Sequence, residues 1–144
     1  MDLDNLYQEL IIDHGQHPRN CKVLADAQCV KEGFNPLCGD RLTVYVCTEN
    51  EKITDACFQG SGCAISVASA SLMTEALKGK SFVDVKKLFH AFHDVVTGGS
   101  DDDLGKLSVL KGVRDYPARV KCATLAWHTM IAAIEGSNDR VSTE

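Results

Sequence analysis

The chain has 144 residues, a formal net charge of −5 and a hydrophobic content of 44%, which suits one globular unit that buries about two-thirds of its unfolded surface. The negative charge argues against a nucleic-acid partner, because no basic face is available to neutralise phosphates. No apolar run reaches the roughly 18 residues of a membrane span, and the acidic N-terminus lacks the lysines of an export signal, so we expect a cytoplasmic protein without a membrane partner.

The first predicted element is a helix over residues 3–13, where apolar side chains recur on one helical face. Residues 14–20 contain a glycine and a proline, which predicts a loop that ends this helix. We expect His14 and His17 to lie on the surface of the loop, where a partner protein can contact them.

Three strand candidates follow, at residues 26–33, 42–48 and 53–59. The middle candidate alternates apolar and polar side chains, which is typical of a strand with one buried face. The polar residues 49–52 predict a hairpin between the second and third strands. This part of the chain therefore predicts a small antiparallel meander.

The second half of the chain has helical periodicity. A helix is predicted over residues 66–78, and a second one begins at the capping residue Ser81 and stops at Gly98. Residues 100–118 are acidic and irregular, with a short helix expected from the aspartates to Leu110. The last helix is predicted over residues 122–135.

This order of elements predicts an α+β fold, in which a small three-stranded antiparallel sheet has its helices packed on one face. No internal repeat, low-complexity tract or linker is evident, so residues 1–144 are expected to form a single domain. The polar tail, residues 136–144, is expected to be frayed.

Seven cysteines in a chain without an export signal indicate a reducing compartment, and metal or thiol chemistry rather than disulfides. Several of them are expected to be small buried hydrophobic residues rather than functional thiols. These are Cys21, Cys29, Cys47 and Cys57.

The other three cysteines lie at turns where a backbone element begins. Cys38 lies on a Pro/Gly turn two residues before Asp40, and Cys63 follows a Gly-Ser-Gly turn at the start of a helix. Cys122 opens the last predicted helix, where Arg119 and a neighbouring lysine are expected to lower its pKa. Taken alone, Cys38 and Cys122 are each better explained as an ordinary packed cysteine.

Taken together, these residues predict one site, because antiparallel topology brings the ends of the strands to one edge of the domain. Three thiolates and a carboxylate satisfy a tetrahedral zinc ion, or leave replaceable positions for iron and sulfide. An aspartate is a more labile ligand than a fourth cysteine, which suits a site that exchanges its contents. The histidines are not expected to be ligands: His90 and His93 lie off the apolar face of their helix, and His128 projects away from Cys122.

The sequence resembles the family of iron–sulfur cluster assembly proteins that comprises IscU, SufU and the NifU N-terminal domain. Three separated segments carry the resemblance, in the family's order, and the opening helix and His-Pro-Arg-Asn loop also fit. They are Asn-Pro-Leu-Cys-Gly-Asp at 35–40, Gly-Ser-Gly-Cys-Ala-Ile-Ser at 60–66 and Arg-Val-Lys-Cys-Ala-Thr-Leu-Ala-Trp at 119–127.

Two details are most similar to the SufU branch. Lys121 stands where the IscU scaffolds have a histidine, and the chain between Cys63 and Cys122 is longer, with the extra length expected within residues 98–116. The resemblance implies Zn²⁺ bound by Cys38, Asp40, Cys63 and Cys122. It also implies persulfide sulfur accepted from a cysteine desulfurase, on the residue matching Cys38, and Arg119 pairing with Asp40 when the site opens.

Our hypothesis is therefore a sulfur relay in iron–sulfur cluster biogenesis, active as a zinc-dependent sulfurtransferase only together with a cysteine desulfurase. A bound zinc ion would keep Cys38 deprotonated and release it when the partner docks. The main alternative is a scaffold that assembles a transient [2Fe–2S] cluster on Cys38, Cys63 and Cys122 and passes it to apo iron–sulfur proteins. A more remote alternative is a zinc-stabilised adaptor without sulfur chemistry.

Overall fold

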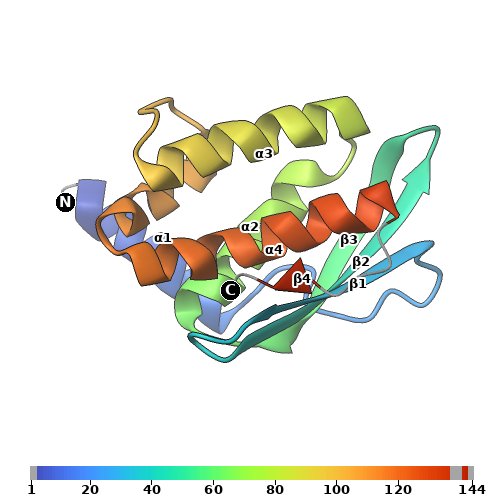
Figure 1. The fold of residues 1–144 in the computed structure, drawn as a ribbon, viewed down its shortest axis with the longest axis horizontal. Coiled ribbons are helices and arrows are strands. Elements are labelled where there is room, and N and C mark those ends of the chain that lie inside the picture. The colour runs from blue at the N-terminus through green and yellow to red at the C-terminus, as the bar shows by residue number, and fades with distance from the viewer. Residues whose placement is uncertain (1–2, 137–140, 143–144) are drawn as a thin grey trace.

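A computed structural model describes residues 3–136 and 141–142 of the chain. The element order is α1 (Leu3–Gln16), β1 (Cys29–Asn35), β2 (Asp40–Glu49), β3 (Lys52–Ser61), α2 (Ala64–Leu77), α3 (Phe82–Thr97), the 3-10 helix η1 (Gly105–Asp115), α4 (Pro117–Glu135) and β4 (Val141–Ser142). Figure 1 shows the helices gathered on one side of the sheet, with the long helix α4 lying across it. The predicted α+β fold is confirmed.

The sheet has the strand order β3-β2-β1-β4. Its first three strands pair antiparallel, as predicted. Each runs one or two residues past a predicted boundary, and β1 begins three residues later than predicted. Strand β4 is an addition: Val141 and Ser142 pair parallel with Gly33 and Phe34 of β1. The expectation of a frayed tail is therefore wrong for these two residues, and the remainder of residues 137–144 lies outside the described residues.

The core lies between the sheet and the helices. Strand β2 contributes Leu42, Val44 and Val46, all at most 2% exposed, which confirms the alternation expected for this strand. Helix α4 contributes Trp127, whose ring stacks on Phe92 of α3 at 4.5 Å between centroids. An aromatic pair of this kind stabilises the fold beyond the area that it buries.

Helix α2 is buried on nearly every side, because α1, α4, η1 and β3 all pack around it. Helix α3 begins and ends as predicted: the Ser81 side chain accepts a hydrogen bond from the backbone of Asp84 at 3.2 Å, and Gly98 adopts the left-handed conformation at the other end. The structure differs from the prediction after Gly98. The chain forms η1 there instead of a short helix ending at Leu110, and α4 begins at Pro117 instead of Cys122.

Helix α1 continues to Gln16, past the predicted loop boundary. The end of α1 packs closely on α2, because a Cβ atom at Gly15 would lie 3.4 Å from Ala64, in ordinary van der Waals contact. The expectation of a surface histidine is wrong for His14, which is 1% exposed and whose Nδ1 lies 2.7 Å from the Ser71 hydroxyl of α2. Tertiary packing against α2 overrides the local helix-stop signal here.

Within the described residues, no helix has both the length and the apolar character that are needed to cross a membrane.

Candidate metal centre

The first part of the site is the hairpin between β1 and β2. Asn35 and Asp40 form the last residue pair of these strands, and both side chains are fully buried. The four residues between them make the turn, with Gly39 in the left-handed region at φ 71°. This geometry leaves Cys38 on the turn, half-buried, directly beside the buried pair.

The second part is the β3–α2 junction. Cys63 is the N-cap of α2, as the sequence predicts, and its Sγ accepts a hydrogen bond from the backbone of Ser66 at 3.5 Å. The backbone N–H of Cys63 points the other way and donates to Asp40 Oδ1 at 2.8 Å. Gly62 makes this contact possible, because a Cβ at that position would overlap Oδ1 of Asp40.

The third part is helix α4, which carries Arg119 and Cys122. Since the helix begins at Pro117, Cys122 lies in its second turn rather than at its start, and its side chain is fully buried. Proline is a common first helical residue, because its missing N–H has no partner within the helix in any case. The extra turn places Arg119 on the helix, one turn before the cysteine.

These three parts meet at one point. One sulfur or oxygen atom from each of Cys38, Asp40 and Cys122 lies within 4.8 Å of the other two, and this is the one such group of three among the described residues. The two sulfur atoms, of Cys38 and Cys122, are 3.2 Å apart. Cys63 lies next to the group, because its backbone N–H donates to Asp40 Oδ1. The structure therefore brings Cys38, Asp40 and Cys122 together and places Cys63 beside them, with its thiol outside the group of three.

Asn35 is a member of this group that sequence reasoning did not identify. Its side-chain Nδ2 donates to Asp40 Oδ2 at 3.1 Å and to Cys122 Sγ at 3.5 Å. A signal was available, because Asn35 and Asp40 flank the turn symmetrically and therefore face each other in a hairpin. The contact with Cys122 depends on the packing of α4 and has no local signal.

Arg119 lies at the exposed side of the group. Its Nη1 is 3.8 Å from Cys38 Sγ and 4.0 Å from Cys122 Sγ. The hydrogen bond to Cys122, with a smaller electrostatic contribution from the nearby cysteines, raises the pKa of the guanidinium above its ordinary value. In this structure the Asp40 carboxylate accepts hydrogen bonds from Asn35 and from the backbone of Cys63. Its pairing with Arg119 stays a prediction.

The expected lowering of the pKa of Cys122 is wrong for this structure. Burial raises the pKa of the Cys122 thiol well above its ordinary range, and its interactions with Cys38, Asp40 and Cys63 add to the effect. Arg119 is too exposed to offset this desolvation. Without a metal, Cys122 is therefore a protonated thiol at neutral pH.

The remaining cysteines lie apart from the group. Cys57 is buried, and Cys29 and Cys47 are half-buried, which fits a packing role. The expectation of a buried residue is wrong for Cys21, which is exposed. Among the described residues, no histidine joins the metal-ligating group. His93 and His128 lie 6.2 Å apart, between ring centroids, at the contact of α3 with α4.

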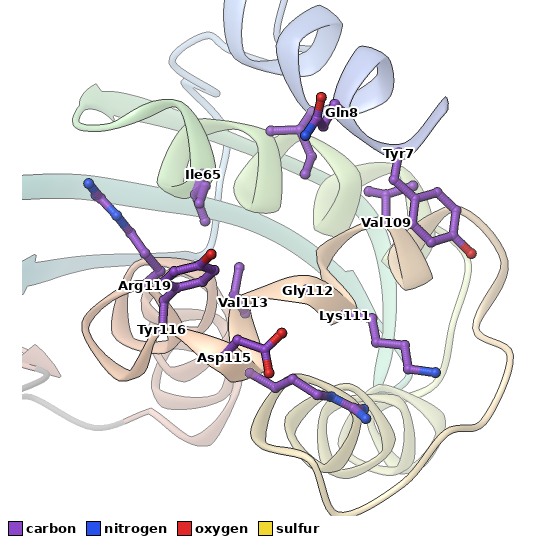
Figure 2. A pocket seen from close by; sticks show the side chains of 12 residues that line it. Tyr7, Gln8, Ile65, Val109, Lys111, Gly112, Val113, Asp115, Tyr116 and Arg119 are labelled. Atoms are coloured by element: carbon purple, nitrogen blue, oxygen red, sulfur yellow. The ribbon is translucent and has the colours of Figure 1, made fainter. Parts of the chain in front are cut away.

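A pocket of about 680 Å³ has Arg119 among its lining residues. Its walls come from α1, the start of α2, η1 and the start of α4. Figure 2 shows Arg119 and Tyr116 at one end of the pocket and Tyr7 with Lys111 at the other. Arg119 lines the pocket and its Nη1 also lies 3.8 Å from Cys38 Sγ, whereas none of the four candidate ligands lines the pocket.

The donor set fits a zinc ion. Three thiols and one carboxylate match a tetrahedral site, in which sulfur atoms bound at about 2.3 Å lie about 3.8 Å apart. The sulfur atoms of Cys38 and Cys122 are 3.2 Å apart, so they need to separate by only about half an ångström. Asn35 also retains a buried Oδ1 without a partner among the described residues, so the polar site is not fully satisfied by the protein alone.

Comparison with known proteins gives a consistent family assignment. The zinc-dependent sulfurtransferase SufU of Bacillus subtilis is 43% identical to this chain over 143 residues, which covers 95% of the chain and 97% of that protein. The iron–sulfur cluster assembly scaffold protein IscU of Streptococcus pyogenes is 38% identical over 138 residues, which covers 94% of the chain and 86% of that protein.

A solved structure supports the same assignment. The crystal structure of a proposed iron–sulfur cluster assembly scaffold protein for the SUF system, from Fervidobacterium islandicum, superposes with a TM-score of 0.84 at 33% identity and covers 92% of this chain and 99% of that one. The family described as the NifU-like N-terminal domain matches residues 6–141. The chain therefore belongs to the NifU-like N-terminal domain family.

Proposed function

We propose that this protein is a sulfur relay of iron–sulfur cluster biogenesis, which accepts persulfide sulfur from a cysteine desulfurase on Cys38. Cys38, Asp40, Cys63 and Cys122 would hold a zinc ion at the same site. The protein would act as a sulfurtransferase only in the presence of the desulfurase. The similarity to the zinc-dependent sulfurtransferase of Bacillus subtilis supports this choice.

The observation that carries the proposal is the unequal burial of the group. Cys122 and Asp40 are fully buried, whereas Cys38 is half-buried on a turn. A sulfur atom carried on a partner's side chain can therefore reach Cys38 without any rearrangement of α4. We expect the partner segment that carries this side chain to lie along the pocket that Arg119 lines.

The chemical step is a thiol–persulfide exchange. The Cys38 thiolate attacks the outer sulfur of the desulfurase persulfide, a new S–S bond forms on Cys38, and the partner's cysteine leaves as a thiolate. No external oxidant or reductant is needed, because one S–S bond replaces another. When bound, zinc would keep the site's thiols deprotonated at neutral pH. Arg119 lies within 4.0 Å of both sulfur atoms and opposes the negative charge that gathers there.

The test is sulfur loading followed by intact-protein mass spectrometry. The protein is incubated with a cysteine desulfurase and cysteine, and the gain of one sulfur atom is measured. We expect the wild type and the control Cys21→Ser to gain sulfur, because Cys21 is exposed but is not a member of the metal-ligating group. Cys38→Ser should fold and gain none. A persulfide on Cys38→Ser would move the acceptor role to Cys122.

The scaffold alternative has one observation in its favour, the 38% identity with an IscU scaffold protein. Metal analysis and the visible spectrum of anaerobically purified protein separate the two functions. Stoichiometric zinc and a colourless protein support the relay, whereas a brown protein with matched iron and sulfide supports the scaffold. An adaptor without sulfur chemistry would leave the turnover of the desulfurase unchanged.

A further inference from the structure

Asn35 lies at the centre of the group and is not one of its proposed ligands. It is the last residue of β1, opposite Asp40, and its side chain is fully buried between the hairpin and α4. A buried amide is costly unless its polar atoms have partners. The contacts of the Asn35 side chain therefore indicate its role in the site.

The amide nitrogen of Asn35 is the atom that faces the ligands. An amide NH₂ has two donors, and Nδ2 lies 3.1 Å from Asp40 Oδ2 and 3.5 Å from Cys122 Sγ. Rotating the amide by half a turn would place Oδ1 against the Asp40 carboxylate, two acceptors facing each other. The orientation with Nδ2 toward the ligands is therefore the favourable one, although it leaves Oδ1 without a partner among the described residues.

Asn35 also links residues that are far apart in sequence. Its two hydrogen bonds join the β1–β2 hairpin to α4, across 87 positions of the chain in the case of Cys122. The second oxygen of Asp40 is held by the backbone N–H of Cys63. Both oxygen atoms of the carboxylate are thus oriented before any metal binds, and each retains a free lone pair.

We propose that Asn35 is the positioning residue of the metal centre, which holds the Asp40 carboxylate and the Cys122 sulfur at the spacing that a metal ion requires. This inference rests on the proposed function, in which the centre binds zinc. Groups that orient metal ligands typically contribute about 10–100-fold to metal affinity. A residue with a merely structural role would change the stability of the protein but not its affinity for zinc.

The experiment measures the zinc affinity of Asn35→Ala and of the volume-retaining variant Asn35→Leu by competition with a chromophoric chelator. Both variants remove the two hydrogen bonds, so we expect both to bind zinc about 10–100-fold more weakly than the wild type. The matched control is Thr129→Val. Thr129 is fully buried on α4 and donates only to Leu125 of its own helix at 2.7 Å, so its variant should bind zinc as the wild type does.

Each outcome is decisive. Asn35 variants that bind zinc within about threefold of the wild type would overturn the inference even if they melt at a lower temperature, because the loss expected from an orienting group is larger. Variants that stay unfolded at saturating zinc, under conditions where Thr129→Val folds, would also overturn it and make Asn35 a residue of the fold. A wild type that binds no zinc would instead refute the proposed function.

Discussion

Gly62→Ala would test how Asp40 is held in the site. Gly62 has an ordinary backbone conformation, so alanine introduces no backbone strain. Its Cβ would nevertheless overlap Oδ1 of Asp40 and lie 3.0 Å from the carboxyl carbon. The Asp40 side chain has to move, and its hydrogen bond to the backbone of Cys63 is lost.

The cost follows from the contacts that Asp40 makes. A hydrogen bond to a charged group contributes about 1.5–3 kcal/mol, and overpacking of a well-packed site costs about 1–3 kcal/mol. The Asp40 side chain can avoid the overlap by moving away, and it then loses its hydrogen bond to Cys63. The cost of overpacking and the cost of the lost hydrogen bond are therefore not added together. We expect the free energy of unfolding to fall by about 2 kcal/mol. At this chain length the melting temperature should fall by roughly 6–8 °C.

The assay measures the urea unfolding and the thermal melting of the zinc-free protein, with circular dichroism as the signal in both. Gly112→Ala is the control, since a Cβ at Gly112 meets nothing within 4 Å and its φ is ordinary. In an Asp40→Ala background, Gly62→Ala should cost less than about 1 kcal/mol, because the overlapping atoms are gone. An equal cost in both backgrounds would refute the assignment of the overlap to Asp40.

Two further predictions concern His14 and Arg119. Desolvation lowers the pKa of His14, with a smaller contribution in the same direction from Arg19 and an opposing one from Glu75. The unfolded state then binds the proton more readily, so stability should fall as the pH drops below about 6.5. Urea midpoints at several pH values should show this dependence weakened in His14→Gln and unchanged in the exposed control His17→Gln. Arg119→Met should retain the zinc content of the wild type and slow sulfur uptake by no more than about fivefold, because exposed charge contacts are weak. A complete loss of zinc would contradict this account of Arg119.

The parts of the fold that the sequence predicts correctly are those with strong local signals. Strand β2 is one example, because burial of one face requires alternating apolar and polar residues. Helix α3 is another, because its ends require particular capping residues. The start of α4 was missed although Tyr116-Pro117 signals it, since the polar residues after the proline hide the helical periodicity. The pairing of β4 has no local signal at all.

For the site, the residue types indicate the ligands but not their environment. Cys38, Asp40, Cys63 and Cys122 are identifiable because each stands at a turn or in a matching segment of the family. The protonation of Cys122 depends on its burial by α4, and the hydrogen bonds of Asn35 depend on the same packing. Both are tertiary effects, which is why the expected direction of the Cys122 pKa was wrong.

The pairing of β4 with β1 affects how shortened forms of the protein should be prepared. A chain cut after Gly136 would leave the peptide groups of Gly33 and Phe34 at an open sheet edge, where another molecule can add a strand. Those residues come directly before Asn35. A strand added at this edge would lie next to Asn35, so zinc affinity should be measured on the full chain rather than on such a truncated protein.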